Sequence, residues 1–123
     1  MSDLLVIGAG GQLSTSLAEA RPDIPCWGLD RIDLTRPAEA EEAVAASGAK
    51  VVINAAAYTA VDKAEEDEAT AHRINADGPA ALARACARLG AALIHVSTDY
   101  VFDGTKSGEY VETDPVAPLG AYG

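Results

Sequence analysis

Four largely apolar runs divide the chain, and each one is followed by glycine or polar residues. They span residues 4–7, 24–29, 51–53 and 91–96. Because these runs are short and continuous rather than alternating, they predict the strands of a parallel sheet that is buried on both faces.

The segments between these strands have the spacing and the terminal residues of helices, over residues 12–20, 35–48 and 65–89. Thr35 is predicted to be the N-cap of the second helix. Within the third, Gly78-Pro79 predicts a kink or a tight helix–helix approach. The order β-α-β-α-β-α-β predicts an α/β fold, a Rossmann-type doubly wound parallel sheet that holds about the first four strands, in the spatial order 3-2-1-4.

Length and composition indicate one domain, residues 1–123, with a hydrophobic content of 49% that supports a packed core. The formal net charge of −10 argues against nucleic-acid and membrane-surface partners, which select basic patches. Cys26 and Cys86 have no metal-binding spacing and are predicted to be buried thiols of a reducing compartment. The first residues show no basic segment and no long apolar run, so we expect no signal peptide, no membrane span and a cytoplasmic location.

A glycine-rich segment, Gly8-Ala9-Gly10-Gly11, joins the first strand to the first helix. Glycines at this place let the backbone turn sharply, and they let a pyrophosphate approach the N–H groups and the positive dipole end of the helix. The last position of the G-x-x-G-x-x-G pattern is Ser14, which predicts a slightly wider contact between helix and strand. We therefore predict a dinucleotide-binding loop, with a plain tight turn as the alternative.

Charged residues follow the second strand. Asp30 is placed to accept hydrogen bonds from the ribose hydroxyls of an adenosine, and a solvated turn aspartate is the alternative. Arg31 comes next and could instead meet a 2′-phosphate, so the pattern favours NAD and leaves NADP open. Asp33 and Leu34 lie nearby in the sequence and could frame the adenine.

The third strand ends in small residues, Ala55-Ala56-Ala57, before Tyr58. Small side chains let a cofactor lie across the carboxyl ends of the strands, and tight packing alone would explain them equally well. After the fourth strand, Thr98 and Tyr122 supply what reduction of a ketone requires, a hydroxyl to hold the oxygen and a phenol to donate a proton. From spacing alone, an ordinary loop tyrosine is the better interpretation of Tyr122, and His95 is predicted to be a packed core histidine.

These segments together resemble the extended short-chain dehydrogenase/reductase superfamily, and within it the family of dTDP-4-dehydrorhamnose reductases. The resemblance covers essentially the whole chain, and its specific parts are residues 54–65 (NAAAYTAVDKAE) and 97–104 (STDYVFDG). Residues 8–13, 33–35 and 75–78 match as shorter segments. The resemblance implies an enzyme that uses NADPH or NADH to reduce the 4-keto group of dTDP-4-dehydro-L-rhamnose to dTDP-L-rhamnose.

The resemblance also implies roles for individual residues. Thr98 and Tyr122 would be catalytic, and Asp99 would contact the dTDP-sugar substrate beside Thr98. Some relatives carry an acidic magnesium ligand early in the first helix, but this chain has Ser14-Thr15-Ser16 there and no cluster with metal-ligand spacing, so we predict no metal site. The cofactor would be bound by Gly8, Gly10, Gly11, Gln12, Leu13, Asp30, Asp33, Leu34, Ala55, Ala56, Ala57, Tyr58 and Tyr122.

The family's catalytic lysine follows the tyrosine by four residues, which lies beyond Gly123, as does the substrate domain. We therefore expect the N-terminal, cofactor-binding part of a parent protein, with little or no reductase activity alone. An uncovered apolar edge of the fourth strand would favour a homodimer. The alternatives are a nucleotide-sugar epimerase or dehydratase of the same superfamily, which Asp99 keeps open, and a non-catalytic dinucleotide-binding regulatory subunit.

Overall fold

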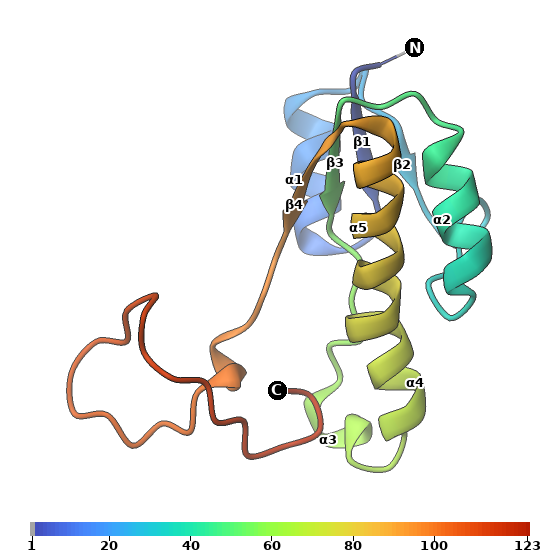
Figure 1. The fold of residues 1–123 in the computed structure, drawn as a ribbon. Helices are drawn as coiled ribbons and strands as arrows, with labels where there is room; N and C mark the ends of the chain where they lie inside the picture. The colour runs from blue at the N-terminus through green and yellow to red at the C-terminus, as the bar shows by residue number, and fades with distance from the viewer. Residues whose placement is uncertain (1) are drawn as a thin grey trace.

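The computed structural model describes residues 2–123 and is built around one parallel β-sheet with helices on both of its faces (Figure 1). Its strands are β1 (Leu4–Ile7), β2 (Cys26–Trp27), β3 (Val51–Asn54) and β4 (Ala92–His95). All neighbouring strands are parallel, which confirms the predicted α/β class.

The strand order is β2-β1-β3-β4, so the predicted order 3-2-1-4 was wrong about the third strand. β3 pairs with both β1 and β4 over its full length, whereas β2 pairs with β1 only through Cys26 and Trp27. Because β2 is so short, another strand on its outer side would pair over only part of its length, and its remaining backbone groups would have no partner. Such a short strand therefore suits the edge of a sheet. The chain therefore adds β2 on one side of β1 and β3 on the other. Open α/β sheets bind ligands outside the carboxyl ends of the strands at such a reversal, which here lies between β1 and β3.

Helices cover the two faces of this sheet. α1 (Gln12–Ala20) lies on one face, while α2 (Pro37–Ala45) and α5 (Gly78–Leu89) lie side by side on the other (Figure 1). Ion pairs join the outer surfaces of α2 and α5, with Arg84 at 2.8 Å from the Glu41 carboxylate. Thr35 is not the N-cap of α2 as predicted, because the helix begins at Pro37 and Arg36 takes that place without a side-chain hydrogen bond.

The core lies between the sheet and the pair α2 and α5. Its largest side chains are at most 2% exposed: Leu5, Ile7, Val44, Val52 and Leu82. Both cysteines are free thiols, and the 3% exposure of Cys86 confirms its prediction as a buried thiol, whose pKa the burial raises. Cys26 is only partly buried, because it belongs to the edge strand β2.

The predicted break near Gly78-Pro79 is a change of helix type. Two short helices, α3 (Val61–Ala64) and α4 (Glu68–His72), lead into a π-helical turn (Arg73–Asp77), and α5 begins directly after it. A Cβ on Gly78 would lie 2.9 Å from the Cβ of Leu34. The close neighbour is therefore the segment after β2 rather than another helix.

After β4 the chain leaves the sheet, and residues 96–123 form an extended segment with one 3₁₀ turn, Asp99–Val101 (Figure 1). Local contacts shape its outer part, where the rings of Phe102 and Tyr110 stack with centroids 4.3 Å apart. The segment then returns toward α3 at its C-terminal end (Figure 1). Across residues 2–123, every helix is too short or too polar to cross a membrane.

Candidate functional site

The ends of β1 and β3 approach each other closely at Gly8. Its φ of 113° lies in the region that favours glycine, and a Cβ there would be 3.1 Å from the backbone nitrogen of Ala56. Gly10 also has a positive φ, of 84°, but a Cβ on it would meet nothing within 4 Å. The glycine segment thus packs tightly against β3 on one side and leaves open space on the other.

Ser14 has a specific role at the N-terminus of α1. Its hydroxyl accepts a hydrogen bond from the Gly11 N–H (3.1 Å) and donates one to the Gly11 carbonyl (3.3 Å), and the residue is 3% exposed. The serine therefore closes the turn where a third glycine is usual. Gln12 and Leu13 are exposed in the first turn, where backbone N–H groups have no partner within the helix.

A cleft of about 280 Å³ opens outside the carboxyl ends of β1 and β3. It contains seven of the predicted cofactor residues, which are Gly8, Gly11, Asp33, Leu34, Ala55, Ala56 and Ala57. Its lining also includes Ser14, Trp27, Gly28, Leu29 and Ile32, which the sequence had not singled out for a cofactor. Most of these residues follow the second strand, and that place in the sequence is the signal that could have identified them. We call this the first cleft.

Other predicted cofactor residues lie outside the first cleft. Asp30 is exposed after β2, and the guanidinium of Arg31 lies 4.8 Å from the ring centre of Trp27.

Asp33 lines the cleft, but its carboxylate accepts hydrogen bonds from the hydroxyl (2.6 Å) and the N–H (2.9 Å) of Thr35. These hydrogen bonds lower the pKa of Asp33 and hold it as an anion that shapes the turn.

Tyr58 does not line the first cleft. Its hydroxyl is buried and makes no hydrogen bond within the described residues. Burial raises the pKa of this phenol, and the nearby negative charge of Asp67 raises it further. The side chain is therefore a neutral packing group next to α4.

A second cleft, of about 110 Å³, brings Thr98 and Tyr122 together. It shares Ala56 and Ala57 with the first cleft, so the two adjoin at the end of β3. Asp99 is exposed on the 3₁₀ turn and is not part of this lining. The fold thus places the two predicted chemical hydroxyls directly beside the predicted cofactor cleft.

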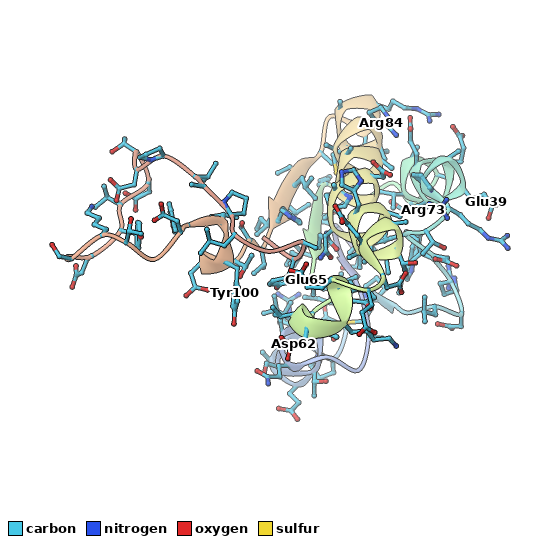
Figure 2. The ribbon with its side chains drawn as sticks, turned by 90° about the horizontal axis from the view of Figure 1, so that it is seen from below. Glu39, Asp62, Glu65, Arg73, Arg84 and Tyr100 are labelled. Carbon is cyan, nitrogen blue, oxygen red and sulfur yellow. The ribbon has the colours of Figure 1, made fainter. Side chains whose placement is uncertain are left out.

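Local contacts orient the two hydroxyl residues. The Thr98 Oγ1 accepts a hydrogen bond from the Tyr100 N–H at 3.2 Å, which leaves its own proton available to another acceptor. The ring of Tyr100 meets the ring of Tyr122 edge-on, with centroids 5.4 Å apart. Figure 2 shows Tyr100 on the extended segment.

Asn75 is a site residue that sequence reasoning missed. Its Oδ1 accepts a hydrogen bond from the Tyr58 N–H (2.8 Å), and its Nδ2 donates one to the Tyr58 carbonyl (2.9 Å). The side chain thus clamps the backbone that follows Ala57, and it also lines the second cleft. The only sequence signal was its presence in the motif 75–78, because the π-helical turn that aims it cannot be deduced from apolar spacing.

His95 is exposed, so its prediction as a packed core histidine was wrong; β4 is an edge strand and leaves this position uncovered. The Oδ1 of buried Asn54 accepts a hydrogen bond from the Ala56 N–H (3.1 Å), so its Nδ2 faces the His95 Nδ1 at 3.1 Å as donor. The imidazole then carries its proton on Nε2 and lines the second cleft in that form. Within residues 2–123, no three His, Cys, Asp or Glu side chains gather where they could hold a metal ion.

Comparison with known proteins agrees with this arrangement. The family described as "RmlD substrate binding domain" matches residues 1–123. A dTDP-4-dehydrorhamnose reductase from Mycobacterium tuberculosis is 50% identical over 127 residues, which covers 97% of this chain and 41% of the relative. One from Burkholderia thailandensis is 48% identical over 124 residues, which covers 98% of this chain and 41% of the relative.

Solved structures give the same result. A dTDP-4-dehydrorhamnose reductase from Bacillus anthracis, solved in complex with NADP, matches with a TM-score of 0.90 at 36% identity, covering 97% of this chain and 44% of that one. The chain spans about two fifths of the length of the curated relatives it matches. The resemblance predicted from the motifs is therefore confirmed, and the chain belongs to the RmlD substrate-binding domain family.

Proposed function

We propose that this chain is the dinucleotide-binding part of an NAD(P)H-dependent reductase that converts dTDP-4-dehydro-L-rhamnose to dTDP-L-rhamnose. One observation carries the proposal: the first cleft, at the glycine segment, adjoins the second cleft, which holds Thr98 and Tyr122. A dinucleotide across the carboxyl ends of β1 and β3 would reach from one to the other. The names of the similar reductases supply the substrate class.

The described residues fit a dinucleotide. The open space beside Gly10 lies next to the N-terminus of α1, where free N–H groups and the helix dipole favour a pyrophosphate. Trp27, Gly28 and Leu29 offer an apolar wall and a bare backbone at the end of β2, where the adenosine would lie. The complex of the Bacillus anthracis relative with NADP supports NADPH as the first cofactor to test, with NADH as its comparison.

Two hydroxyl groups of this chain would then act on the ketone oxygen. When bound, the nicotinamide cofactor supplies a hydride to the ketone carbon. We assign to the Tyr122 phenol the donation of a proton to the ketone oxygen as negative charge develops there. The Thr98 hydroxyl, whose oxygen already accepts the Tyr100 N–H, donates a hydrogen bond to the same oxygen. The small side chains of Ala56 and Ala57 keep the junction between cofactor and ketone open.

The proposal extends to the location and the assembly of the protein. The free thiols of Cys26 and Cys86 support a cytoplasmic location. For the 123-residue chain taken alone, a homodimer would involve the β4 edge, where Ile94 is 52% exposed. Cell fractionation and light scattering test these two points.

The test uses the complete gene product with NADPH and dTDP-4-dehydro-L-rhamnose. We expect loss of the nicotinamide absorbance and a single product that is two hydrogens heavier than the ketone, identified by mass spectrometry. An isomer formed without net oxidation of NADPH would indicate an epimerase instead. Loss of water without net oxidation would indicate a dehydratase. Cofactor binding without any turnover would indicate a regulatory subunit.

A further inference from the structure

Glu65 lies outside both clefts, yet it holds the segment that carries Tyr122. Its carboxylate oxygen Oε1 accepts a hydrogen bond from the backbone N–H of Ala121 at 2.9 Å. Ala121 directly precedes Tyr122, so this bond acts on the backbone one residue away from the phenol. Figure 2 shows Glu65 on the side of the molecule to which the C-terminal segment returns.

A second observation, at Gly120, supports the same contact. A Cβ at this position would lie 2.8 Å from the same Glu65 oxygen. The carboxylate therefore lies directly against the backbone of residues 120–121, in space that any larger residue would occupy. Because Gly120 has no side chain, the carboxylate can occupy its present position beside the Ala121 N–H.

The backbone of Glu65 is fixed by the helix that it ends. It is the C-cap of α3, and the preceding Ala64 is fully buried, with its N–H bonded to the Ala60 carbonyl at 2.9 Å. The carboxylate is thus presented from the folded body of the protein. By contrast, the Tyr100 ring and the Val101 carbonyl, which also contact the returning segment, belong to the extended segment itself.

We propose that Glu65 is a positioning residue for Tyr122: by accepting the Ala121 N–H, it sets the place of the phenol in the second cleft. This inference rests on the proposed reductase function, in which Tyr122 donates the proton. Loss of the contact leaves the first cleft intact and displaces the proton donor. The effect therefore falls on kcat and spares the KM for NADPH, because small displacements of a reacting group reduce rates strongly.

Four variants test this positioning role. Glu65→Ala removes the acceptor, while Glu65→Gln keeps an oxygen that can accept the Ala121 N–H. Gly120→Ala displaces the carboxylate from the other side, at little cost to the fold because the displaced group is the end of a flexible side chain. Glu66→Ala is the matched control, since it removes the same charge from the next residue, whose side chain has no hydrogen bond to residues 118–122 in the described structure.

Two measurements are made on each variant: amide hydrogen exchange of Ala121 in the 123-residue chain, and steady-state kinetics of the complete gene product. We expect Glu65→Ala and Gly120→Ala to speed exchange and to lower kcat, each by about three- to tenfold, which is the scale of one lost hydrogen bond. The KM for NADPH stays within about twofold, because the first cleft is untouched. Glu65→Gln restores both values, and Glu66→Ala changes neither.

The outcomes separate this inference from the function on which it rests. A wild-type protein that turns over no ketone overturns the proposed function. An active wild type whose kcat is the same in Glu65→Ala overturns the role of Glu65 alone, as does exchange at Ala121 that this substitution leaves unchanged. A Glu66→Ala loss equal to that of Glu65→Ala would show a general charge effect and would also overturn the role.

Discussion

Replacing Gly10 by alanine tests whether this residue borders the cofactor, because the loss of stability and the loss of cofactor affinity can be measured separately. Gly10 has a φ of 84°, and a Cβ added there would meet no atom within 4 Å. The cost to folding is therefore confined to the left-handed backbone, about 1–2 kcal/mol for a residue with a Cβ. The added methyl group would stand in the open space beside the N-terminus of α1, where we place the pyrophosphate.

Gly90 is the matched control within the same chain. It ends α5 with a φ of 67°, and a Cβ on it would also meet nothing within 4 Å. Gly90→Ala should therefore lose the same 1–2 kcal/mol, roughly, by the same backbone mechanism. It lies at the amino end of β4, away from both clefts, so its affinity for NADPH should equal that of the wild type.

The assay measures unfolding by urea and NADPH binding by calorimetry for both variants. We expect similar losses of unfolding free energy, but a Kd for NADPH at least about tenfold weaker in Gly10→Ala only, a difference of about 1.4 kcal/mol. Equal NADPH affinity in the two variants would refute the placement of the pyrophosphate at Gly10.

Three further predictions concern the acid, the core and the turn after β2. In the complete gene product, Tyr122→Phe should lower kcat by roughly 10²–10⁴, because it removes the proton donor, as steady-state kinetics can measure. Leu82→Ala should destabilise the chain by about 3 kcal/mol, because Leu82 is fully buried in the core, and urea denaturation checks it. Hydrogen bonds from Thr35 lower the pKa of Asp33, so their stabilisation is present above the usual carboxyl pKa and is lost as pH falls through the lowered one. Thr35→Val should thus destabilise at pH 7 and approach the wild type in acid unfolding curves.

The fold class could be predicted from sequence because its signals are local. Continuous apolar runs mark buried strands, and the glycines after β1 mark a turn into a helix. The strand order depended on the length of β2, which only two residues, Cys26 and Trp27, form. That length is decided by pairing with β1, and its sequence signal was Pro25 and Gly28, which flank the two residues directly.

The candidate site could be predicted only in part for a similar reason. Residues that lie at strand ends, such as Gly8 and Ala56, line the clefts as their place in the sequence suggests. Asn75 was missed because its role depends on a π-helical turn, and His95 was misjudged because β4 is an edge strand. Asp99 and Tyr58 have the right neighbours in the sequence, but neither residue lines either cleft.

The most direct test of the central claim is an NMR titration of the 123-residue chain with NADPH. If the two adjoining clefts form one dinucleotide and ketone site, amide signals should shift at Gly8, Gly11 and Gly28 in the first cleft. Signals at Ala56 and Ala57 should shift at the junction, and smaller shifts should reach Thr98 in the second cleft. Absence of binding, or shifts confined to the surface of α2 and α5, would contradict the account.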